Sequence, residues 1–296
     1  MISSKPKISL IIPVYNGEKT LVACLNSVLA QDFSDYEVII VDNNSNDKTK
    51  EIIVSFLKKS DKFSYVFEIN RGRANARNAG VEVASGEIIA MIDADCKAPS
   101  NWLAKISEPI ILEGESVVSG FEKDAVGNYW SKMRQVADWQ FIESKINKGY
   151  INHLDTKNFA IKSDILKRLR FNSELLAYED WDLYLRLKKE NIKIKFLPEL
   201  LVEHCHDSSF LELFFSQYMR GKCLALILNI YHNNPEFKEI LEADESARSF
   251  KIRNFILFIP WAIWQFISRP LEAPYNVTAD LAWKCGIVSA LFKIWR

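Results

Sequence analysis

The sequence predicts an α/β protein with a doubly wound, mostly parallel sheet flanked by helices and followed by a C-terminal helical extension. In the first hundred residues, short apolar runs alternate with segments of helical periodicity, and polar residues follow several runs at the same end. After His206 the chain becomes helical, aromatic and locally basic. Sheets of this kind bind ligands beyond the carboxyl ends of their strands, so we expect the site there.

Strands and helices alternate in the first part of the predicted domain. Apolar stripes at helical spacing separate the strands, and an Ala-rich segment forms the third helix. In chain order we expect strand 8–12, helix 21–29, strand 37–41, helix 52–57, strand 65–67, helix 73–84 and strand 87–92.

Residues 99–206 are less regular but continue the same domain. They predict strand 117–119, a Trp-rich amphipathic stretch at 129–142, helix 179–189 and strands near 192–196 and 201–203. No low-complexity linker interrupts the chain. We therefore expect one domain over residues 1–207, with halves 1–98 and 99–207, and an extension over 208–296.

Composition narrows the class of protein. A hydrophobic content of 48% in 296 residues supports a packed core, and 38 basic residues against 38 acidic ones do not favour nucleic acid. Five scattered cysteines without a C-x-x-C predict neither a disulfide framework nor a zinc site, and they favour a reducing cytosol. We expect no signal peptide, because polar and basic residues precede the first strand, and no membrane span, because no apolar run reaches 18 residues.

Two aspartates follow the fourth predicted strand, in Asp93-Ala94-Asp95. Side chains two residues apart in an extended segment point the same way, so we expect both carboxylates to face one site. Such a pair suits Mg²⁺ or Mn²⁺ bridging a diphosphate. An isolated motif of this kind is usually a solvated turn, but its position at a strand end favours the metal site.

Polar residues also follow the first two strands. Pro13, Tyr15, Asn16 and Glu18 lie where a nucleotide would dock, and the Asp42 carboxylate can accept hydrogen bonds from a base or ribose. Taken singly, each segment is a loop between a strand and a helix, and Asn43, Asn44 and Asp47 fit turn and cap roles better than ligand binding. The common position of the other residues at the carboxyl edge makes them candidate nucleotide-binding residues.

Three arginines, Arg71, Arg73 and Arg77, cluster at the start of the third predicted helix. Guanidinium groups and free backbone N–H groups at a helix start suit phosphate, although a solvated basic helix face is an equal alternative. The segment is neither G-x-G-x-x-G nor a Walker loop, which weakens dinucleotide and ATP hypotheses.

Together and in this order, these segments resemble the family 2 glycosyltransferases, whose fold is of the GT-A type. The resemblance covers about the first 205 residues. It implies a nucleotide-binding half over 1–98 and an acceptor-binding half over 99–207. The matching pieces are Pro13-Val-Tyr-Asn16, Val41-Asp42, Ala76-Arg-Asn-Ala-Gly80, Gly86-Glu-Ile-Ile and Asp93-x-Asp95.

The resemblance also implies roles for single residues. Asp42 is expected to contact the nucleobase, Asp93 the ribose or a metal-bound water, and Asp95 the metal. In many relatives a histidine after a later strand completes the metal shell, and His204 has the better register for this in His204-Cys205-His206. The expected metal ligands for Mn²⁺ or Mg²⁺ are Asp93, Asp95 and His204, and the expected donor-binding residues are Pro13, Tyr15, Asn16, Glu18, Asp42, Arg73, Arg77 and Asp93.

The segment Tyr178-Glu-Asp-Trp-Asp182 resembles the family's Glu-Asp helix, whose aspartate deprotonates the acceptor hydroxyl. We assign this base to Asp180, because Asp182 lies four residues before Arg186 and fits a surface ion pair. Glu179 either orients the site or caps the helix. The residues expected to line the acceptor pocket are Asn158, Glu179 and Trp181.

The expected function is transfer of a sugar, with inversion, from a nucleoside-diphosphate sugar to an acceptor hydroxyl, with UDP favoured. One alternative is a sugar nucleotidyltransferase, which should carry a Gly-rich basic loop after the first strand where this chain has Pro13-Val-Tyr-Asn16. A second is a non-catalytic nucleotide-sugar-binding subunit, which would not need Asp93, Asp95 and Asp180 together.

The C-terminal extension suggests contact with a membrane surface. Residues 248–296 contain seven Lys or Arg against two acidic residues and four Trp, and the apolar segment 254–267 is too short to span a bilayer. A second such segment covers 281–295. We expect a peripheral enzyme on the cytosolic membrane face acting on a glycan or lipid-linked acceptor in cell-envelope or surface-polysaccharide assembly. The alternative is packing against the catalytic domain or against a second copy in a homodimer.

Overall fold

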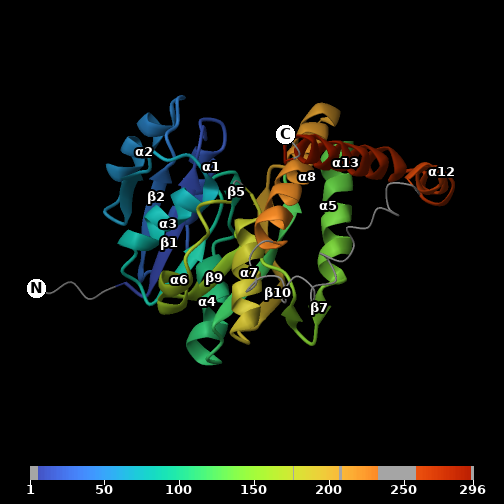
Figure 1. Cartoon of the computed structure of the whole chain (residues 1–296). Coiled ribbons are helices and arrows are strands. Elements are labelled where there is room, and N and C mark those ends of the chain that lie inside the picture. The colour runs from blue at the N-terminus through green and yellow to red at the C-terminus, as the bar shows by residue number, and fades with distance from the viewer. Residues whose placement is uncertain (1–5, 176, 207–208, 233–257, 295–296) are drawn as a thin grey trace, which may run out of the picture. The chain divides into compact units, whose positions relative to one another are not determined.

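The computed structural model describes residues 6–175, 177–206, 209–232 and 258–294 (Figure 1). The chain divides into two compact units. The first comprises Met1–Ala125 and Phe141–Cys205, and the second comprises Val126–Gln140 and His206–Arg296. A segment from the middle of the chain therefore groups with the C-terminal extension.

A mixed, mostly parallel sheet forms the centre of the first unit. Over the described residues its order is β3-β2-β1-β4-β9-β6-β10-β8-β7, and β5 pairs with β10. The pairs joining β1 to β2, β2 to β3, β1 to β4 and β6 to β10 are parallel. The strands are β1 (Ile8–Val14), β2 (Tyr36–Asp42), β3 (Phe63–Phe67), β4 (Ile88–Met91), β5 (Cys96–Lys97), β6 (Val117–Asp124), β7 (Ile146–Asn147), β8 (Tyr150–Ile151), β9 (Phe159–Lys162) and β10 (Ile194–His204).

Helices cover both faces of this sheet. Their bounds are α1 (Leu21–Leu29), α2 (Thr49–Leu57), α3 (Arg73–Val83), α4 (Trp102–Leu112), α6 (Ser163–Leu169) and α7 (Glu179–Lys189). Alternate residues of β1 face opposite sides. Leu10 and Ile12 pack in one core with α1, α2 and α4, whereas Ile11 contacts α3 at Gly80, where a Cβ would overlap its side chain. The predicted doubly wound arrangement is confirmed.

Several features of residues 99–206 were not predicted. Helices α4 and α6 and strands β7, β8 and β9 were missed, and β9 lies antiparallel between β4 and β6. The two strands predicted near 192–196 and 201–203 are one strand, β10, whose register shifts between Phe196 and Leu201. Pro198 lies at this irregularity and cannot donate to a ladder, which explains the apparent break in the sequence pattern.

The second unit is helical in its described part. It contains α8 (Phe210–His232), α12 (Phe258–Ser268), α13 (Ala273–Ile294) and most of α5 (Tyr129–Glu143). Helices α8 and α13 cross closely, because a Cβ on Gly221 would overlap the carbonyl of Trp283 and one on Gly286 that of Tyr218. Among the described helices, none has the length and apolar character needed to cross a membrane. The predicted segments 254–267 and 281–295 lie partly outside the described residues.

Candidate active site

The carboxyl ends of β1, β2 and β4 meet at one edge of the sheet, because these strands are parallel and adjacent. Asp42 ends β2 and is buried. Its Oδ1 accepts the backbone N–H of Ser45 at 3.0 Å, and its Oδ2 lies 3.3 Å from the Tyr65 hydroxyl. The fold therefore holds this carboxylate in one orientation beside the edge where a base or ribose is expected.

Other predicted nucleotide-binding residues lie on the loops above this edge. Tyr15 is exposed and the guanidinium carbon of Arg71 lies 4.6 Å from its ring centroid. Asn16 has a positive φ of 53° and its Oδ1 accepts the N–H of Asn46 at 2.9 Å. Pro13 is half-buried on β1, whereas Glu18 and Arg73 are exposed. Tyr15, Glu18 and Arg73 thus remain accessible to a ligand.

Asn43, for which the sequence favours a turn or cap role, joins these loops. Its side-chain amide donates to the carbonyl of Asn70 at 2.7 Å, and its Oδ1 accepts the N–H of Gly72 at 2.8 Å. Gly72 has a φ of 138°, which favours glycine, and it immediately precedes α3. Asn43 therefore fixes where α3 begins.

Arg77 is buried and bridges two carboxylates. Its Nη1 lies 2.5 Å from Glu179 Oε1 and its Nη2 lies 3.1 Å from Asp93 Oδ1. Burial disfavours its charge, but the neighbouring carboxylates Asp93 and Glu179 outweigh this and raise its pKa. This arginine joins the end of β4 to the start of α7, a contact that sequence spacing does not reveal.

The expectation that Asp93-Ala94-Asp95 is an extended segment is wrong. The segment forms a turn in which the N–H of Cys96 donates to the carbonyl of Asp93 at 3.0 Å. Because the backbone turns, the period-two argument for extended chain does not apply. Asp93 pairs with Arg77, whereas Asp95 pairs with His204.

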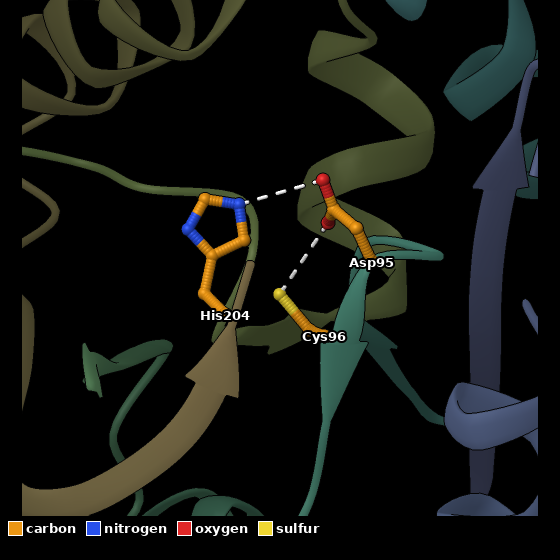
Figure 2. Close-up of side chains that lie close together, drawn as sticks. All are labelled: Asp95, Cys96 and His204. Carbon is orange, nitrogen blue, oxygen red and sulfur yellow. Dashed lines mark hydrogen bonds and ion pairs between the residues drawn. The ribbon is translucent and has the colours of Figure 1, made fainter. Parts of the chain in front are cut away.

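Asp95, Cys96 and His204 place three potential ligand atoms within 4.8 Å of one another (Figure 2). The Nε2 of His204 lies 3.4 Å from Asp95 Oδ2. Burial raises the pKa of the Cys96 thiol, so it stays neutral and is a poor ligand for Mg²⁺ or Mn²⁺. The carboxylate and imidazole fit such a cation, leaving further coordination positions for a diphosphate.

The charge balance of this cluster supports a cation site. Burial opposes protonation of His204, but its hydrogen bonds to Asp95 and Glu122 raise its pKa to about 9. Burial likewise opposes ionisation of Asp95, and the His204 contact outweighs it, so the pKa of Asp95 is lowered. The two carboxylates thus favour a positive charge at this position, and a divalent cation would have to displace the Nε2 proton before His204 could ligate it.

Asp180 lies in the first turn of α7, after Tyr178, which has a left-handed φ of 64°. The Oδ1 of Asp180 accepts the backbone N–H of Trp181, the next residue, at 2.7 Å. Burial, followed by the charges of Glu179 and Asp155, raises the pKa of Asp180 to about 7 despite opposition from Arg77. A carboxylate with this pKa is suited to accept a proton near neutral pH.

Asp182 does not lie on the surface as expected. It is fully buried, and Arg186, four residues later, contacts it through Nε at 2.9 Å. Arg186 also donates to the carbonyls of Leu169 and Arg170. The pair therefore anchors α7 to the end of α6. Trp181 is half-buried, with its ring centroid 6.5 Å from that of Tyr178.

Asn158 is buried and its side chain serves the fold. Its Oδ1 accepts the Nε1–H of Trp102 at 2.8 Å, and its Nδ2 donates to the carbonyls of Phe121 and Leu200 at 2.8 and 2.7 Å. A Cβ on Gly120 would overlap this amide. Because these bonds occupy the amide, we treat Asn158 below as structural rather than acceptor-binding.

Comparison with known proteins gives a consistent match. The sequence pattern of Glycosyl transferase family 2 matches residues 9–170. Glycosyltransferase AglE of Haloferax volcanii is 30% identical over 227 residues, covering 75% of this chain and 74% of that protein. A GalNAc(5)-diNAcBac-PP-undecaprenol beta-1,3-glucosyltransferase of Campylobacter jejuni is 28% identical over 196 residues, covering 62% of this chain and 60% of that protein.

Solved structures share the fold. The mannosyltransferase PcManGT of Pyrobaculum calidifontis, in complex with GDP-Man and Mn²⁺, superposes with a TM-score of 0.69 at 18% identity over 98% of this chain and 88% of its own. S. aureus TarS 1-349 in complex with UDP-GlcNAc gives 0.56 at 16% identity, covering 95% of this chain and 92% of its own.

Proposed function

Since this chain belongs to glycosyl transferase family 2 and has the GT-A fold, we propose that it transfers a sugar with inversion from a nucleoside-diphosphate sugar, a UDP-sugar in the first instance, to an acceptor hydroxyl. The observation that carries this proposal is the Arg77 bridge. Through Asp93 and Glu179 it joins the end of a nucleotide-binding strand to the helix that holds Asp180. The bridge thus connects the donor edge to a candidate base.

The donor is proposed to bind along the edge formed by β1, β2 and α3. The oriented carboxylate of Asp42 suits recognition of the base or ribose, and Tyr15, after β1, and Arg73, at the start of α3, are exposed. The Nη1 and Nη2 of Arg77 are paired with Glu179 and Asp93, so its proposed role is to orient those carboxylates instead of binding phosphate directly. The same geometry leaves Pro13, Asn16 and Glu18 as neighbours of the nucleotide.

Mn²⁺ or Mg²⁺ is proposed to be held by Asp95 and His204, with Asp93 nearby in the same turn. When bound, such a cation offsets the negative charge that develops on the leaving nucleoside diphosphate. The imidazole and carboxylate already lie close together, so the protein has little rearrangement to make.

Transfer itself is proposed to be a single displacement. Asp180 accepts the proton of the acceptor hydroxyl, the oxygen of that hydroxyl forms a bond to the anomeric carbon, and the bond from that carbon to the diphosphate oxygen breaks. One displacement inverts the anomeric configuration. Trp181 and Glu179, beside the base, are proposed to border the acceptor.

A thermal-shift panel tests donor binding. We expect one nucleoside-diphosphate sugar with Mn²⁺ or Mg²⁺ to raise the melting temperature. At a concentration a hundredfold above its Kd, such a ligand raises the free energy of unfolding by about 2.7 kcal/mol. UDP-, GDP- and TDP-sugars are compared with nucleoside triphosphates, which a nucleotidyltransferase would prefer. The product linkage from the stabilising donor is then read by NMR. No shift with any diphosphate sugar, or a retained configuration, contradicts the proposal.

The acceptor is proposed to be a glycan or lipid-linked molecule used in cell-envelope synthesis, reached from the cytosolic membrane face. The name of the Campylobacter jejuni relative describes an acceptor carried on undecaprenol. Helix α12 of this chain supports the membrane contact. Its one buried residue is the polar Gln265, whose Oε1 accepts a hydrogen bond from Asn276 at 3.1 Å.

The apolar side chains of α12 are directed outward. Ile259, Ile263 and Ile267 follow helical spacing and are 58–76% exposed, and Trp264 and Phe266 are each 53% exposed. Arg269 follows the helix and its side chain is 46% exposed. A helix that lies in a membrane interface needs an apolar face exposed on the protein surface. The exposed apolar residues of α12, opposite its buried Gln265, provide such a face.

Vesicle binding tests this contact. The full chain is expected to co-sediment with anionic vesicles at low salt, and Ile263→Glu with Ile267→Glu should weaken binding by at least about tenfold, since each buried Ile contributes about 1.5–3 kcal/mol. Val22→Glu with Val54→Glu, which alters exposed apolar residues of α1 and α2, is the matched control. The membrane proposal is contradicted if both variants lose vesicle binding equally, or if the full chain does not co-sediment. The exposed apolar face of α12 would then be explained by a homodimer interface.

A further inference from the structure

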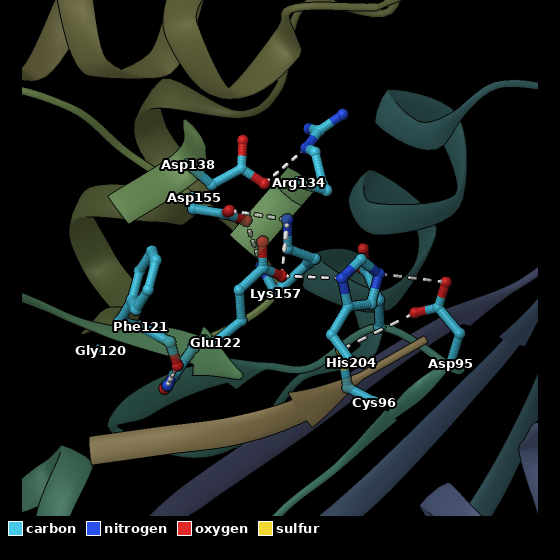
Figure 3. A network of polar contacts seen from close by, with 12 residues as sticks. Asp95, Cys96, Gly120, Phe121, Glu122, Arg134, Asp138, Asp155, Lys157 and His204 are labelled. Carbon is cyan, nitrogen blue, oxygen red and sulfur yellow. Dashed lines mark hydrogen bonds and ion pairs between the residues drawn. The ribbon is translucent and has the colours of Figure 1, made fainter. Parts of the chain in front are cut away.

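The imidazole of His204 lies between the carboxylate of Glu122 on β6 and that of Asp95 in the turn before β5 (Figure 3). Its Nε2 lies 3.4 Å from Asp95 Oδ2, and its Nδ1 lies 2.8 Å from Glu122 Oε2. The ring is therefore oriented from both sides. The sequence motifs point to Asp95 and His204 but not to Glu122.

Sheet register explains this arrangement. Strand β10 lies between β6 and β5, with Val202 opposite Glu122 and His204 opposite Cys96. Residues opposite one another share a face, and side chains two residues apart on a strand do too. Glu122 is therefore the diagonal neighbour of His204 on the same face, while the turn containing Asp95 precedes β5 on the other side.

Glu122 is itself held in place. It is 4% exposed, and its Oε2 lies 3.0 Å from the Lys157 ammonium. Lys157 lies 2.8 Å from Asp155 Oδ2. A buried carboxylate needs such compensation by charge and hydrogen bonds, so Lys157 keeps Glu122 available to the imidazole. Figure 3 shows this chain of contacts running from Asp155 to Asp95.

We propose that Glu122 is a positioning residue for metal binding. With a divalent cation bound, Glu122 would accept the Nδ1–H of His204 and so keep the neutral ring oriented, with its unprotonated Nε2 facing the cation on the side of Asp95. Lys157 and Asp155 hold Glu122 in turn. This inference rests on the metal dependence in the proposed function, and it adds a residue that acts on the metal only through His204.

Mn²⁺ affinity of the whole chain, measured by electron paramagnetic resonance with and without UDP, tests this without any turnover. Glu122→Leu removes the acceptor and should weaken Mn²⁺ binding by about 10–100-fold. Glu122→Gln retains an acceptor oxygen and should recover most of that affinity. Thermal melts of each variant establish that it is folded.

Glu203→Leu is the matched control. It removes the same charge one residue before His204 on β10, where Glu203 pairs with Lys123 at 3.1 Å and Lys97 at 3.4 Å. Its Mn²⁺ affinity should match that of the unaltered chain. If Glu203→Leu weakens binding as much as Glu122→Leu, the effect is one of general charge and the inference is overturned.

A double-mutant cycle tests whether Glu122 acts through His204. His204→Gln should weaken Mn²⁺ binding, and adding Glu122→Leu should produce no further loss, because the residue to be positioned is gone. Additive losses would make Glu122 a separate contributor and overturn the inference. Binding weakened by His204→Gln but unaffected by Glu122→Leu overturns it while leaving the proposed function intact.

A measurement on the unaltered chain covers the case in which Glu122→Leu does not fold. With ¹⁵N-labelled histidine and Mg²⁺ bound, NMR should find the His204 proton on Nδ1. A proton on Nε2 overturns the inference. If the unaltered chain binds neither Mn²⁺ nor Mg²⁺, both the inference and the metal part of the proposed function fail.

Discussion

Asp180→Asn is expected to lower the transfer rate by about 10²–10⁴-fold, the usual contribution of general-base catalysis, while donor binding persists. Asparagine keeps the shape of the side chain and its acceptor oxygen for the N–H of Trp181, but it cannot take a proton. The rate is measured by single-turnover product formation at saturating donor, and donor binding by thermal shift.

Asp182→Asn serves as the comparison on the same helix. Asp182 is buried against Arg186, so its substitution should lower the melting temperature by weakening the anchor of α7. The rate per folded molecule should change little. A large loss of rate in Asp182→Asn, with Asp180→Asn still active, would reverse the assignment of the base.

The pH dependence provides a second readout of Asp180→Asn. The folded chain raises the pKa of Asp180 to about 7 from an ordinary value near 3.9, so between these values the folded state binds the proton and the unfolded state does not. The stabilisation that comes from this bound proton is fully present at low pH and is lost as the pH rises toward 7. Relative to the unaltered chain, Asp180→Asn should therefore melt higher at pH 8 than at pH 4. An equal difference at both pH values contradicts the raised pKa.

Asp95→Ala is expected to lower transfer by at least about 10³-fold, because losing about 4 kcal/mol of charge stabilisation at the departing diphosphate corresponds to that factor. The folded state should persist, since the Asp95 side chain is 43% exposed in a turn outside the core. Metal-dependent stabilisation by the donor should disappear with it. Rates and melting temperatures are compared with and without excess chelator.

Glu203→Ala is the control for this substitution. It removes another partly exposed carboxylate from the same edge of the sheet, and its ion pairs are with Lys97 and Lys123 alone among the contacts described for it. Its rate should stay within a few-fold of the unaltered chain. Full transfer by Asp95→Ala, or by the unaltered chain in excess chelator, would defeat the assignment of the metal ligand.

Local patterns were sufficient for the first half of the fold. The apolar runs of β1, β2 and β4 and the stripes of α1 and α2 were predicted because their periodicity records which face is buried, and that information lies within a few residues. The order of the segments also pointed to the family, which the match over residues 9–170 shows. Strand β9 was missed because only its pairing with β4 and β6, from distant parts of the chain, identifies it.

The sequence by itself determined the fold class, the family and which edge of the sheet carries the polar residues, because these depend on short-range pattern and segment order. Only the tertiary structure decided which side chains meet there. Arg77 and Glu179 are 102 residues apart in the chain, and Glu122 reaches His204 only through the register of β6 and β10. Such contacts depend on how distant strands pair and on where burial leaves a charge in need of a partner, and neither is encoded in local spacing.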